Sequence, residues 1–549
     1  MNKKCLEKYK YYFILAGLIG LGIFLRLWEI GTESLRLDEA QSIWQASHTT
    51  EFIRFYTLKN VHLPLHNTFL HFWIALFGGK AIAGRISSAI FGILSLPALY
   101  LLSREFLKRK WALTATGIGA ISPFWIWYSR EIRMYTLLTL ITVFSYYFFV
   151  RIIRTNQLKN YIFYTITNII GIYTHYFFFL VLLVQAVFFL STWKVKWNNK
   201  LTIPKKRVLY NFTAVVIVLI IAFSPWFYAF INSHGSGTLA PELIKPSSFN
   251  IFLSFFEFTF GYQPENITTA MIALWPLVTL MGFVFLEKRR PIKPSIFLMV
   301  TGILLPVIFT FSVSILYKPI YLTRYLIIIT PFYYIFIAWV LSQSKGLFQK
   351  IFISIFGISL IAAFINQNTS PDITIKENYR EAINYISGET SHRDIVVLAP
   401  PYMIYPFQYY YHGPAQITSI PIWNKRKGAI PEITPEKLIQ DIEIIKGNRQ
   451  RIFLFIADDL KGGLEAKNFL DNKFTKLEKK QFSKTLWLNV YQTEYKQKVY
   501  AIKDGDTLSS VAYEFYQNES FYKIIAQANN LTNPDFIEIG QSLKIPSFP

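Results

Sequence analysis

YYFILAGLIGLGIFL, residues 11–25, contains no charged residue and is the stretch that decides the fold class. An uncharged apolar run of this kind, extended by its flanks towards twenty residues, is typical of a helix that crosses a bilayer. VVIVLIIAF at residues 215–223 is another, and similar runs recur through the first two thirds of the chain. A single run could be a buried core helix. A long series of them predicts a polytopic α-helical membrane protein.

The charge distribution points to the same class. The chain has 549 residues and a net charge of +23, but residues 1–366 hold only 12 of the 33 acidic residues. The basic residues of this part gather in alternate loops: MNKKCLEKYK, REFLKRK, RIIRTNQLKN, KVKWNNKLTIPKKR, EKRRPIKP and SQSKGLFQK. Loops rich in Lys and Arg face the cytoplasm, so the pattern places the N-terminus there. The basic charge is a topology signal, and we expect no nucleic-acid partner.

The basic loops separate about eleven predicted spans, near 11–27, 82–103, 111–128, 134–150, 161–173, 175–192, 208–230, 267–286, 295–316, 325–342 and 350–366. An odd number of spans places the C-terminus outside the cytoplasm. The stretch HNTFLHFWIALFG, residues 66–78, is too short to span comfortably. It is predicted to be an amphipathic, aromatic-rich helix at the outer surface.

The predicted external loops carry the candidate site residues. The first, residues 28–81, contains LRLDEAQSI with the adjacent acids Asp38 and Glu39. Two shorter loops, YSREIRMY and YKPIYLTRY, supply Glu131, Arg133 and Arg324. External arginine runs against the positive-inside bias. Each one is explained either by a headgroup contact or loop salt bridge, or by a site that holds a lipid-linked phosphate.

A carboxylate near a phosphate-binding cation is suited to group transfer. The carboxylate can take a proton from an acceptor hydroxyl, and the cation can stabilise a departing phosphate. A lipid carrier can keep its tail in the bilayer while its head reacts at the ends of the helices. The cytoplasmic side has no phosphate-cradling glycine loop and no dinucleotide fingerprint, so we expect no cofactor.

Several stretches together resemble one known family. They are LRLDEAQSI (35–43), HLPLHNTFLHFW (62–73), GRISSAIFGILSLPALYLLSREF (84–106), SPFWIWYSREIRMYTLLTL (122–140), IYTHYFFFLVLLVQ (172–185) and RYLIIITPFYY (324–334). In order and spacing they are similar to the GT-C glycosyltransferases that use polyprenyl-phosphate sugars, in the branch of protein O-mannosyltransferases and the lipid A aminoarabinose transferase. Arg130 stands where that pattern usually has Gln. The resemblance covers most of residues 10–366.

The resemblance implies roles for the candidate residues. Asp38 would be the catalytic base, and Glu39 would orient the acceptor or Asp38. Arg133, Glu131, Arg324 and Arg85 would bind the donor and its carrier phosphate. The implied reaction is inverting transfer of a hexosyl or pentosyl group as polyprenyl phosphate leaves. The alternative for Asp38-Glu39 is an ordinary first turn of a helix, where acids favour the dipole.

His62, His66 and His71 lie at or near helical spacing, and His175 lies in another loop. Imidazoles four residues apart on a helix can chelate a metal ion. A polar interfacial helix shows the same spacing by chance, and we predict no metal site.

Residues 367–496 are predicted to form a small external α/β domain. ENYREAINYI reads as an amphipathic helix, and DIVVLAP, RIFLFIAD and LWLNVYQTEY read as strands. PYMIYPFQYYYHGP could bind sugar by stacking, but a packed aromatic core or a lid is the preferred interpretation.

Residues 497–549 resemble a LysM module, a βααβ domain that binds wall glycan. The landmarks include Gly505, Asp506, Thr507, Leu508 and the run Asn533-Pro534-Asp535. By analogy the glycan groove lies between these two stretches and takes N-acetylglucosamine-containing glycan such as peptidoglycan. Asp506 is predicted to cap the first helix.

The chain is therefore predicted to be a GT-C-like transmembrane glycosyltransferase (1–366), an external α/β domain (367–496) and a LysM domain (497–549). We expect it in the cytoplasmic membrane with both C-terminal domains outside. The acceptor could be protein, lipid or wall polymer. A lipid-linked-sugar flippase and a wall-anchored scaffold are the alternatives. A flippase predicts ionisable residues in mid-span, and a scaffold does not need the Asp38-Glu39 loop.

Overall fold

The computed structural model of the chain forms two compact units, residues 1–376 and 377–549. The structure describes residues 3–59, 62–191, 205–233, 243–265, 267–268, 293–370, 373, 377–426, 430–447, 449–457, 462–495, 498–516, 519–531 and 533–546. The first unit is helical, and the second contains all of the described strands.

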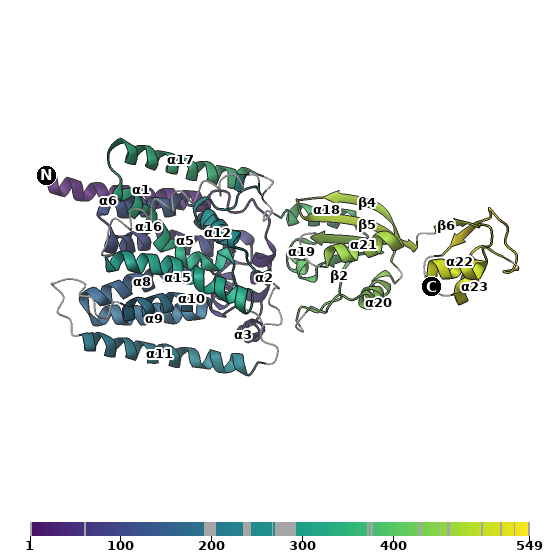
Figure 1. The fold of residues 1–549 in the computed structure, drawn as a ribbon, viewed down its shortest axis with the longest axis horizontal. Helices are drawn as coiled ribbons and strands as arrows, with labels where there is room; N and C mark the ends of the chain where they lie inside the picture. The colour runs from purple at the N-terminus through teal and green to yellow at the C-terminus, as the bar shows by residue number, and fades with distance from the viewer. Residues whose placement is uncertain are drawn as a thin grey trace. The chain divides into compact units, whose positions relative to one another are not determined.

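The first unit is a bundle of long apolar helices (Figure 1). They are α1 (Lys3–Leu27), α5 (Ala81–Phe106), α8 (Tyr135–Thr155), α9 (Leu158–Thr174), α10 (Phe178–Ser191), α11 (Lys205–Ile231), α15 (Pro294–Leu316), α16 (Thr330–Gln343) and α17 (Gly346–Thr369). The 3-10 helix η1 (Thr323–Ile329) leads into α16. Helices α8 and α16 are mostly buried, whereas few residues of α1, α11 and α17 are buried inside the protein. An exposed apolar surface of this extent is typical of a membrane protein.

Seven helices among the described residues are long and apolar enough to cross a membrane. The shorter helices α9 and α10 stand at the predicted spans 161–173 and 175–192. Apart from residues 267 and 268, the predicted span 267–286 lies outside the described residues. The helical membrane class is confirmed, and the predicted number of spans is not.

The predicted span 111–128 is broken into α6 (Arg109–Ile121) and α7 (Pro123–Ser129). Pro123 has no N–H to donate, and its ring clashes with the preceding turn, so a helix does not continue smoothly through it. The Ser122 hydroxyl accepts a hydrogen bond from the Trp125 N–H at 3.2 Å and caps the new helix. The short α7 then carries the chain into residues 130–134, which hold two of the predicted site residues.

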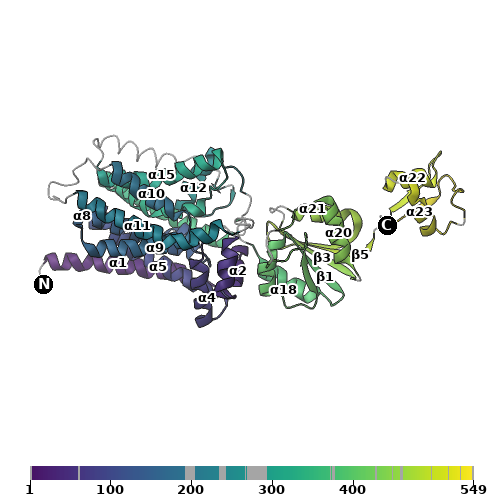
Figure 2. The ribbon, with the colours of Figure 1, turned by 90° about the horizontal axis from the view of Figure 1, so that it is seen from below.

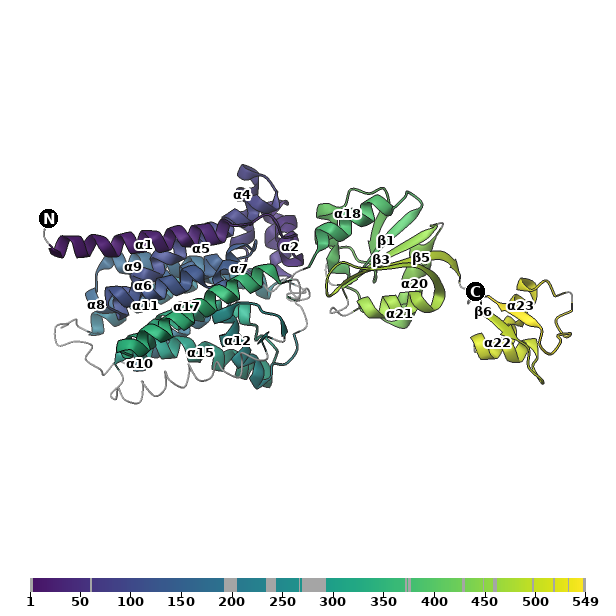
Figure 3. The same ribbon diagram turned by 90° about the horizontal axis from the view of Figure 1, so that it is seen from above.

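Short helices lie at the end of the bundle opposite the N-terminus. After α1 come α2 (Leu37–Ala46), α3 (Thr50–Leu58) and α4 (Leu65–Phe77), and α12 (Ser248–Phe260), which was not predicted, lies at the same end (Figures 1 and 3). Helix α4 stands where the surface helix 66–78 was predicted, with Phe72, Leu76 and Phe77 exposed at 57%, 78% and 59%. Such an apolar face suits a bilayer interface.

We expect Gly302→Ala to destabilise the helical unit by about 1–3 kcal/mol. A Cβ at Gly302 of α15 would stand 2.3 Å from Cδ2 of Phe332, a fully buried ring on α16. The matched control is Gly357→Ala on α17, where a Cβ meets nothing within 4 Å. Thermal unfolding of the purified protein in detergent measures both variants. Equal unfolding temperatures would contradict the tight α15–α16 contact.

The second unit contains a five-stranded sheet within its described residues, in the order β2-β1-β3-β5-β4. Its elements are α18 (Tyr379–Glu389), β1 (Asp394–Ala399), α19 (Ile404–Tyr410), β2 (Gln416–Ser419), α20 (Pro435–Lys446), β3 (Arg451–Ala457), α21 (Gly463–Lys473), β4 (Phe474–Gln481) and β5 (Leu486–Tyr495). Strand β1 is parallel to β2 and β3, and β5 is antiparallel to β3 and β4. Helices cover both faces (Figure 2), which explains the continuous apolar sequences of β1 and β3.

The aromatic stretch PYMIYPFQYYYHGP contributes to this core. Tyr405 and Phe407 are buried at 2% and 0% exposure, and the Phe407 ring lies 6.0 Å from that of Phe455 on β3. These contacts favour the packed-core interpretation of the stretch.

The last part of the chain has the predicted βααβ order. It consists of β6 (Lys498–Ala501), α22 (Leu508–Tyr516), α23 (Tyr522–Ala528) and β7 (Ser542–Ile545), with β6 antiparallel to β7. The prediction that Asp506 caps the first helix is wrong. Thr507 is the cap, because its hydroxyl accepts from the Ser510 N–H at 3.0 Å, while Asp506 accepts from the Lys503 N–H and the Tyr500 hydroxyl.

Candidate active site

The acids Asp38 and Glu39 lie in the first turn of α2. Glu39 Oε2 accepts a hydrogen bond from the Arg36 N–H at 3.1 Å, which caps the helix. Acids in a first turn also interact favourably with the helix dipole. The pair therefore does lie in the first turn of a helix, as the alternative interpretation has it. The two side chains nevertheless have different surroundings.

Glu39 forms a buried two-point ion pair with Arg85 of α5. Arg85 Nε and Nη2 lie 2.9 and 2.7 Å from the two Glu39 oxygens, and the two side chains are 2% and 0% exposed. The other N–H groups of Arg85 donate to the carbonyls of residues 30, 33 and 34, so all five are used. Glu39 Oε1 also accepts from the Ile132 N–H at 3.2 Å. The pair thus joins α2, α5 and the turn between α7 and α8.

These contacts decide the charge of Glu39. Burial raises the pKa of this carboxyl, but the charge and hydrogen bonds of Arg85 outweigh burial, so the net pKa is lowered. Glu39 is ionised at neutral pH and fully paired with Arg85. In this arrangement Arg85 therefore has no unused N–H group with which to make the predicted phosphate contact.

Asp38, one residue earlier, points to a more open environment. Its Oδ2 lies 3.2 Å from Arg324 Nη1, with side-chain exposures of 26% for Asp38 and 35% for Arg324. Burial acts to raise the pKa of Asp38, but the positive charges of Arg133 and Arg324 lower it to about 2. Asp38 is therefore a carboxylate at neutral pH.

Arg133 lies beside the same carboxylate, buried at 5% exposure. Its Nη1 donates to the Ser42 hydroxyl at 3.3 Å and its Nη2 donates to His62 Nε2 at 2.9 Å. Since a guanidinium can only donate, His62 Nε2 is the acceptor and the imidazole proton sits on Nδ1. Burial and the charge of Arg133 hold the pKa of His62 well below its usual value, so the ring is neutral.

Glu131 is turned towards Arg36 instead of the Asp38–Arg324 pair. Arg36 Nη1 lies 3.3 Å from Glu131 Oε2, and its guanidinium lies 3.5 Å from the centre of the Trp127 ring. Burial raises the pKa of Glu131, and the charge of Arg36 counteracts part of this effect. In this position Glu131 fixes Arg36, whose charge also acts on Asp38.

Several buried donors around Asp38 have no hydrogen-bond partner among the described residues. They are Arg133 Nε, Arg324 Nε, His62 Nδ1 and the Tyr135 hydroxyl. Tyr135 is fully buried, and its phenol group interacts electrostatically with Arg324, Arg133 and Asp38. Unsatisfied buried donors are costly, and such donors on four residues that interact electrostatically with Asp38 suit a ligand that accepts hydrogen bonds.

Tyrosine rings line one side of this group. Tyr128 and Tyr262 join their hydroxyls in a short contact, and the Tyr128 ring packs 4.8 Å from that of Tyr135. Tyr135 and Tyr262 were not predicted from the sequence. Tyr135 closes the YSREIRMY loop, which was a usable signal, whereas Tyr262 follows α12, an unpredicted helix.

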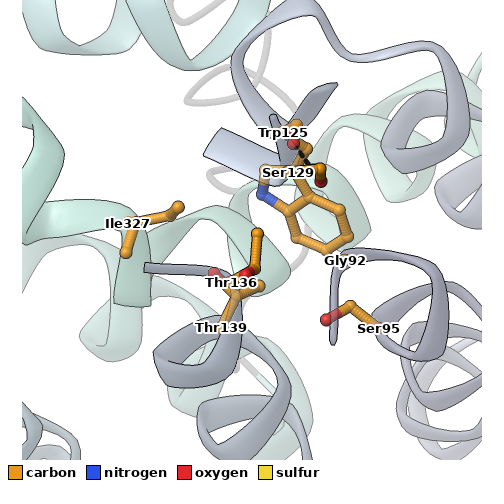
Figure 4. Close-up of a pocket in the computed structure, with 7 residues that line it drawn as sticks. All are labelled: Gly92, Ser95, Trp125, Ser129, Thr136, Thr139 and Ile327. Carbon is orange, nitrogen blue, oxygen red and sulfur yellow. Dashed lines mark hydrogen bonds between the residues drawn. The ribbon is translucent and has the colours of Figure 1, made fainter. Parts of the chain in front are cut away.

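A separate internal cavity lies among α5, α7, α8 and η1 (Figure 4). Its lining residues are Gly92, Ser95, Trp125, Ser129, Thr136, Thr139 and Ile327. The cavity is far smaller than a small-molecule site. None of the predicted site residues lines it.

The histidines do not converge on a metal site. His66 contacts Asn67, His71 contacts the Ala46 carbonyl, and His62 contacts Arg133. Within the described ranges, no group of three His, Cys, Asp or Glu side chains is arranged to hold a metal ion.

The predicted glycan-binding residues fall into two classes in the second unit. Gly505 has φ +84°, which favours glycine, and the Asp535 N–H donates to Asn533 Oδ1 at 3.1 Å in an exposed turn. Leu508, at 3% exposure, belongs to the core of this part with Leu543 and Ile545. It packs inside the domain instead of lining a groove.

Two family models match the chain. The model of the dolichyl-phosphate-mannose-protein mannosyltransferases matches residues 61–229, and the LysM domain model matches residues 500–546. Curated relatives match over short segments. An uncharacterized protein of Deinococcus radiodurans is 50% identical over 48 residues, 9% of this chain and 19% of its own length. Esterase MT1326 of Mycobacterium tuberculosis is 39% identical over 49 residues, 9% and 11% of the two lengths. The chain spans less than a fifth of either relative.

Solved structures resemble the chain over most of its length. ArnT from Cupriavidus metallidurans in the apo state has a TM-score of 0.59 at 12% identity, covering 89% of this chain and 98% of ArnT. The same protein bound to undecaprenyl phosphate has a TM-score of 0.52 at 12% identity, covering 88% and 98%. An Archaeoglobus fulgidus oligosaccharyltransferase tethered with an acceptor peptide has a TM-score of 0.50 at 11% identity, covering 81% and 69%. The chain thus has a helical membrane fold of the GT-C type and resembles GT-C glycosyltransferases, with a LysM match near its C-terminus.

Proposed function

We propose that the chain is a membrane glycosyltransferase that moves a sugar from a polyprenyl-phosphate carrier to an acceptor hydroxyl at the outer face of the cytoplasmic membrane. The observation that carries the proposal is the set of unpaired donors on Arg133, Arg324 and Tyr135 around the ionised Asp38. Such donors suit a phosphate beside a general base. The undecaprenyl phosphate bound to ArnT adds support for this class of carrier.

In the proposed reaction the acceptor oxygen attacks the anomeric carbon from the side opposite the phosphate. The bond between the anomeric carbon and the phosphate oxygen breaks, and its electron pair leaves with polyprenyl phosphate. Asp38 takes the proton of the acceptor hydroxyl. Arg324 and Arg133 stabilise the charge on the leaving phosphate. Attack from the opposite face inverts the configuration at the anomeric carbon.

Glu39 and Arg85 have positioning roles in this proposal. Their ion pair fixes α2 against α5 and the turn before α8, which helps to hold Asp38 close to Arg133. Glu131 acts in the same way through Arg36. Arg133 and Arg324 are then the residues of the predicted phosphate-binding set that contact the carrier.

Arg324→Ala tests the carrier site. We expect it to weaken binding of undecaprenyl phosphate by about 10- to 100-fold, because a charge-assisted hydrogen bond is lost. Arg54→Ala on the exposed face of α3 is the matched control, since it removes the same charge from the same end of the bundle. Binding is measured on purified protein in detergent. Equal affinities for the two variants would contradict the proposed role of Arg324.

We also propose that residues 497–549 bind peptidoglycan through the predicted LysM groove. Deleting them should abolish retention of the protein on purified peptidoglycan, while undecaprenyl phosphate still binds, because Arg324 and Arg133 belong to the first unit. A folded deletion variant that loses carrier binding would place the carrier site elsewhere. One that stays on peptidoglycan would contradict the LysM role.

A further inference from the structure

The ion pair between Asp38 and Arg324 engages both of the groups that the proposed transfer needs free. Asp38 Oδ2 and Arg324 Nη1 are 3.2 Å apart. A carboxylate held by a guanidinium is a poor base, and a guanidinium held by a carboxylate is a poor phosphate ligand. The arrangement in the structure is therefore that of a resting site.

The neighbouring pair, Glu39 and Arg85, shows what a permanent ion pair looks like in the same loop. This pair is bidentate and almost fully buried, and every N–H group of Arg85 is used in a hydrogen bond. The Asp38–Arg324 pair has a single contact, is about a quarter to a third exposed, and leaves Arg324 Nε without a partner among the described residues. Ion pairs that are partly exposed to solvent contribute little to stability, so separating this pair costs little free energy.

We propose that the carrier phosphate takes Arg324 from Asp38 and thereby activates its own catalytic base. The inference rests on the proposed function, since it assigns an order of events to that site. The free protein holds Asp38 paired and weakly basic. When the donor binds, its phosphate takes the Arg324 contact, and the freed carboxylate turns to the acceptor hydroxyl.

The charges around Asp38 support this order. It is faced by Arg36 at the start of α2, by His62 from the segment before α4, by Glu131, Arg133 and Tyr135 around the α7–α8 turn, and by Arg324 of η1. The positive charges of Arg133, Arg324 and Arg36 act to lower the pKa of Asp38. A phosphate that binds Arg324 and Arg133 brings negative charge to this group. The pKa of Asp38 then rises, and its strength as a base rises with it.

The chemical step is unchanged: the acceptor O–H proton goes to Asp38, and the electron pair of the broken bond leaves with the phosphate.

Competition for Arg324 is measured by carrier binding alone, without any acceptor. The probe is undecaprenyl phosphate without sugar, titrated into the purified full-length chain in detergent at neutral pH. We expect Asp38→Asn to bind it about three- to fivefold more tightly than the parent protein, the size expected when one partly exposed ion pair no longer competes. Glu51→Gln, an exposed acid on α3, removes the same charge and should bind as the parent does.

The outcomes separate the inference from the proposed function. Tighter binding by Asp38→Asn but not by Glu51→Gln supports the competition. Equal or weaker binding by a folded Asp38→Asn overturns it and leaves the carrier site standing. No binding by the parent or by any variant overturns the proposed function itself. If Asp38→Asn does not fold, as judged by gel filtration, Asp38→Ser provides the same comparison.

Discussion

Asp38→Asn is expected to lower sugar transfer by on the order of 10²–10⁴, the usual contribution of general-base assistance. The amide keeps the size of the carboxylate and most of its hydrogen bonding, but it cannot accept the acceptor proton. The measurement is transfer from a synthetic short-chain polyprenyl-phosphate sugar by the purified protein. Because Arg133 and Arg324 remain in place, the variant still binds the carrier.

Glu51→Gln is the control for this variant. It makes the same chemical change at an exposed acid of the same segment between α1 and α5, and it should transfer at the parent rate. A near-parent rate for a folded Asp38→Asn would mean that the acid pair serves only as the first turn of α2. That result would remove the base from the proposed mechanism while leaving the fold and the carrier site untouched.

Arg85→Met is expected to destabilise the helical unit by about 3–5 kcal/mol. The substitution leaves the Glu39 carboxylate at 0% exposure without its partner, and the Met side chain cannot satisfy the carbonyls of residues 30, 33 and 34. Breaking one side of a buried pair is costly because the remaining charge stays desolvated. Denaturant or thermal unfolding in detergent measures the loss.

Two further variants test whether the unpaired charge of Glu39 causes the loss of stability. Arg54→Met, on the exposed face of α3, should change stability by less than about 0.5 kcal/mol. The double variant Glu39→Gln with Arg85→Met should recover part of the loss, because no buried charge is left unpaired. If Arg85→Met is as stable as the parent but fails to bind undecaprenyl phosphate, Arg85 contacts the carrier after all, and the positioning role is wrong.

The predictions for Asp38→Asn and Arg85→Met assign different roles to the adjacent acids Asp38 and Glu39. In the proposed mechanism Glu39 holds α2 in place, and Asp38 is the base. A charge change at Glu39 should therefore reduce stability and transfer together, whereas a change at Asp38 should reduce transfer with little loss of stability. The contrast can be read from one unfolding measurement and one transfer assay on the same preparations.

Much of the fold could be predicted from local patterns. The hydropathy of runs such as residues 11–25 and 215–223 predicts helices α1 and α11, and the alternation of helix and strand signals predicts β1, β3 and β5. These elements depend on interactions over a few residues, which a sequence displays directly. Helix α12 was not predicted because its thirteen residues, eight of them apolar, are too few for a membrane span.

The helix break at Ser122-Pro123 could be predicted only in part from the sequence. The proline is visible in the sequence, but Pro97 of α5 and Pro306 of α15 lie inside unbroken helices. Neighbouring helices can compensate a missing N–H, so a proline alone does not say whether a helix stops. Packing around Trp125, whose indole N–H donates to Thr330 at 2.8 Å, accompanies the break here.

The sequence by itself determined the class of the protein, the loops that carry its acids and arginines, and the pair Asp38-Glu39 as the place to look. It could not divide the work between those two acids. Successive residues on a helix point about 100° apart, so Glu39 faces Arg85 in the core while Asp38 faces Arg324, which is 286 positions away in the chain. Only the tertiary structure decides which cation each carboxylate meets, because contacts between distant segments depend on the packing of whole helices and leave no local pattern in the sequence.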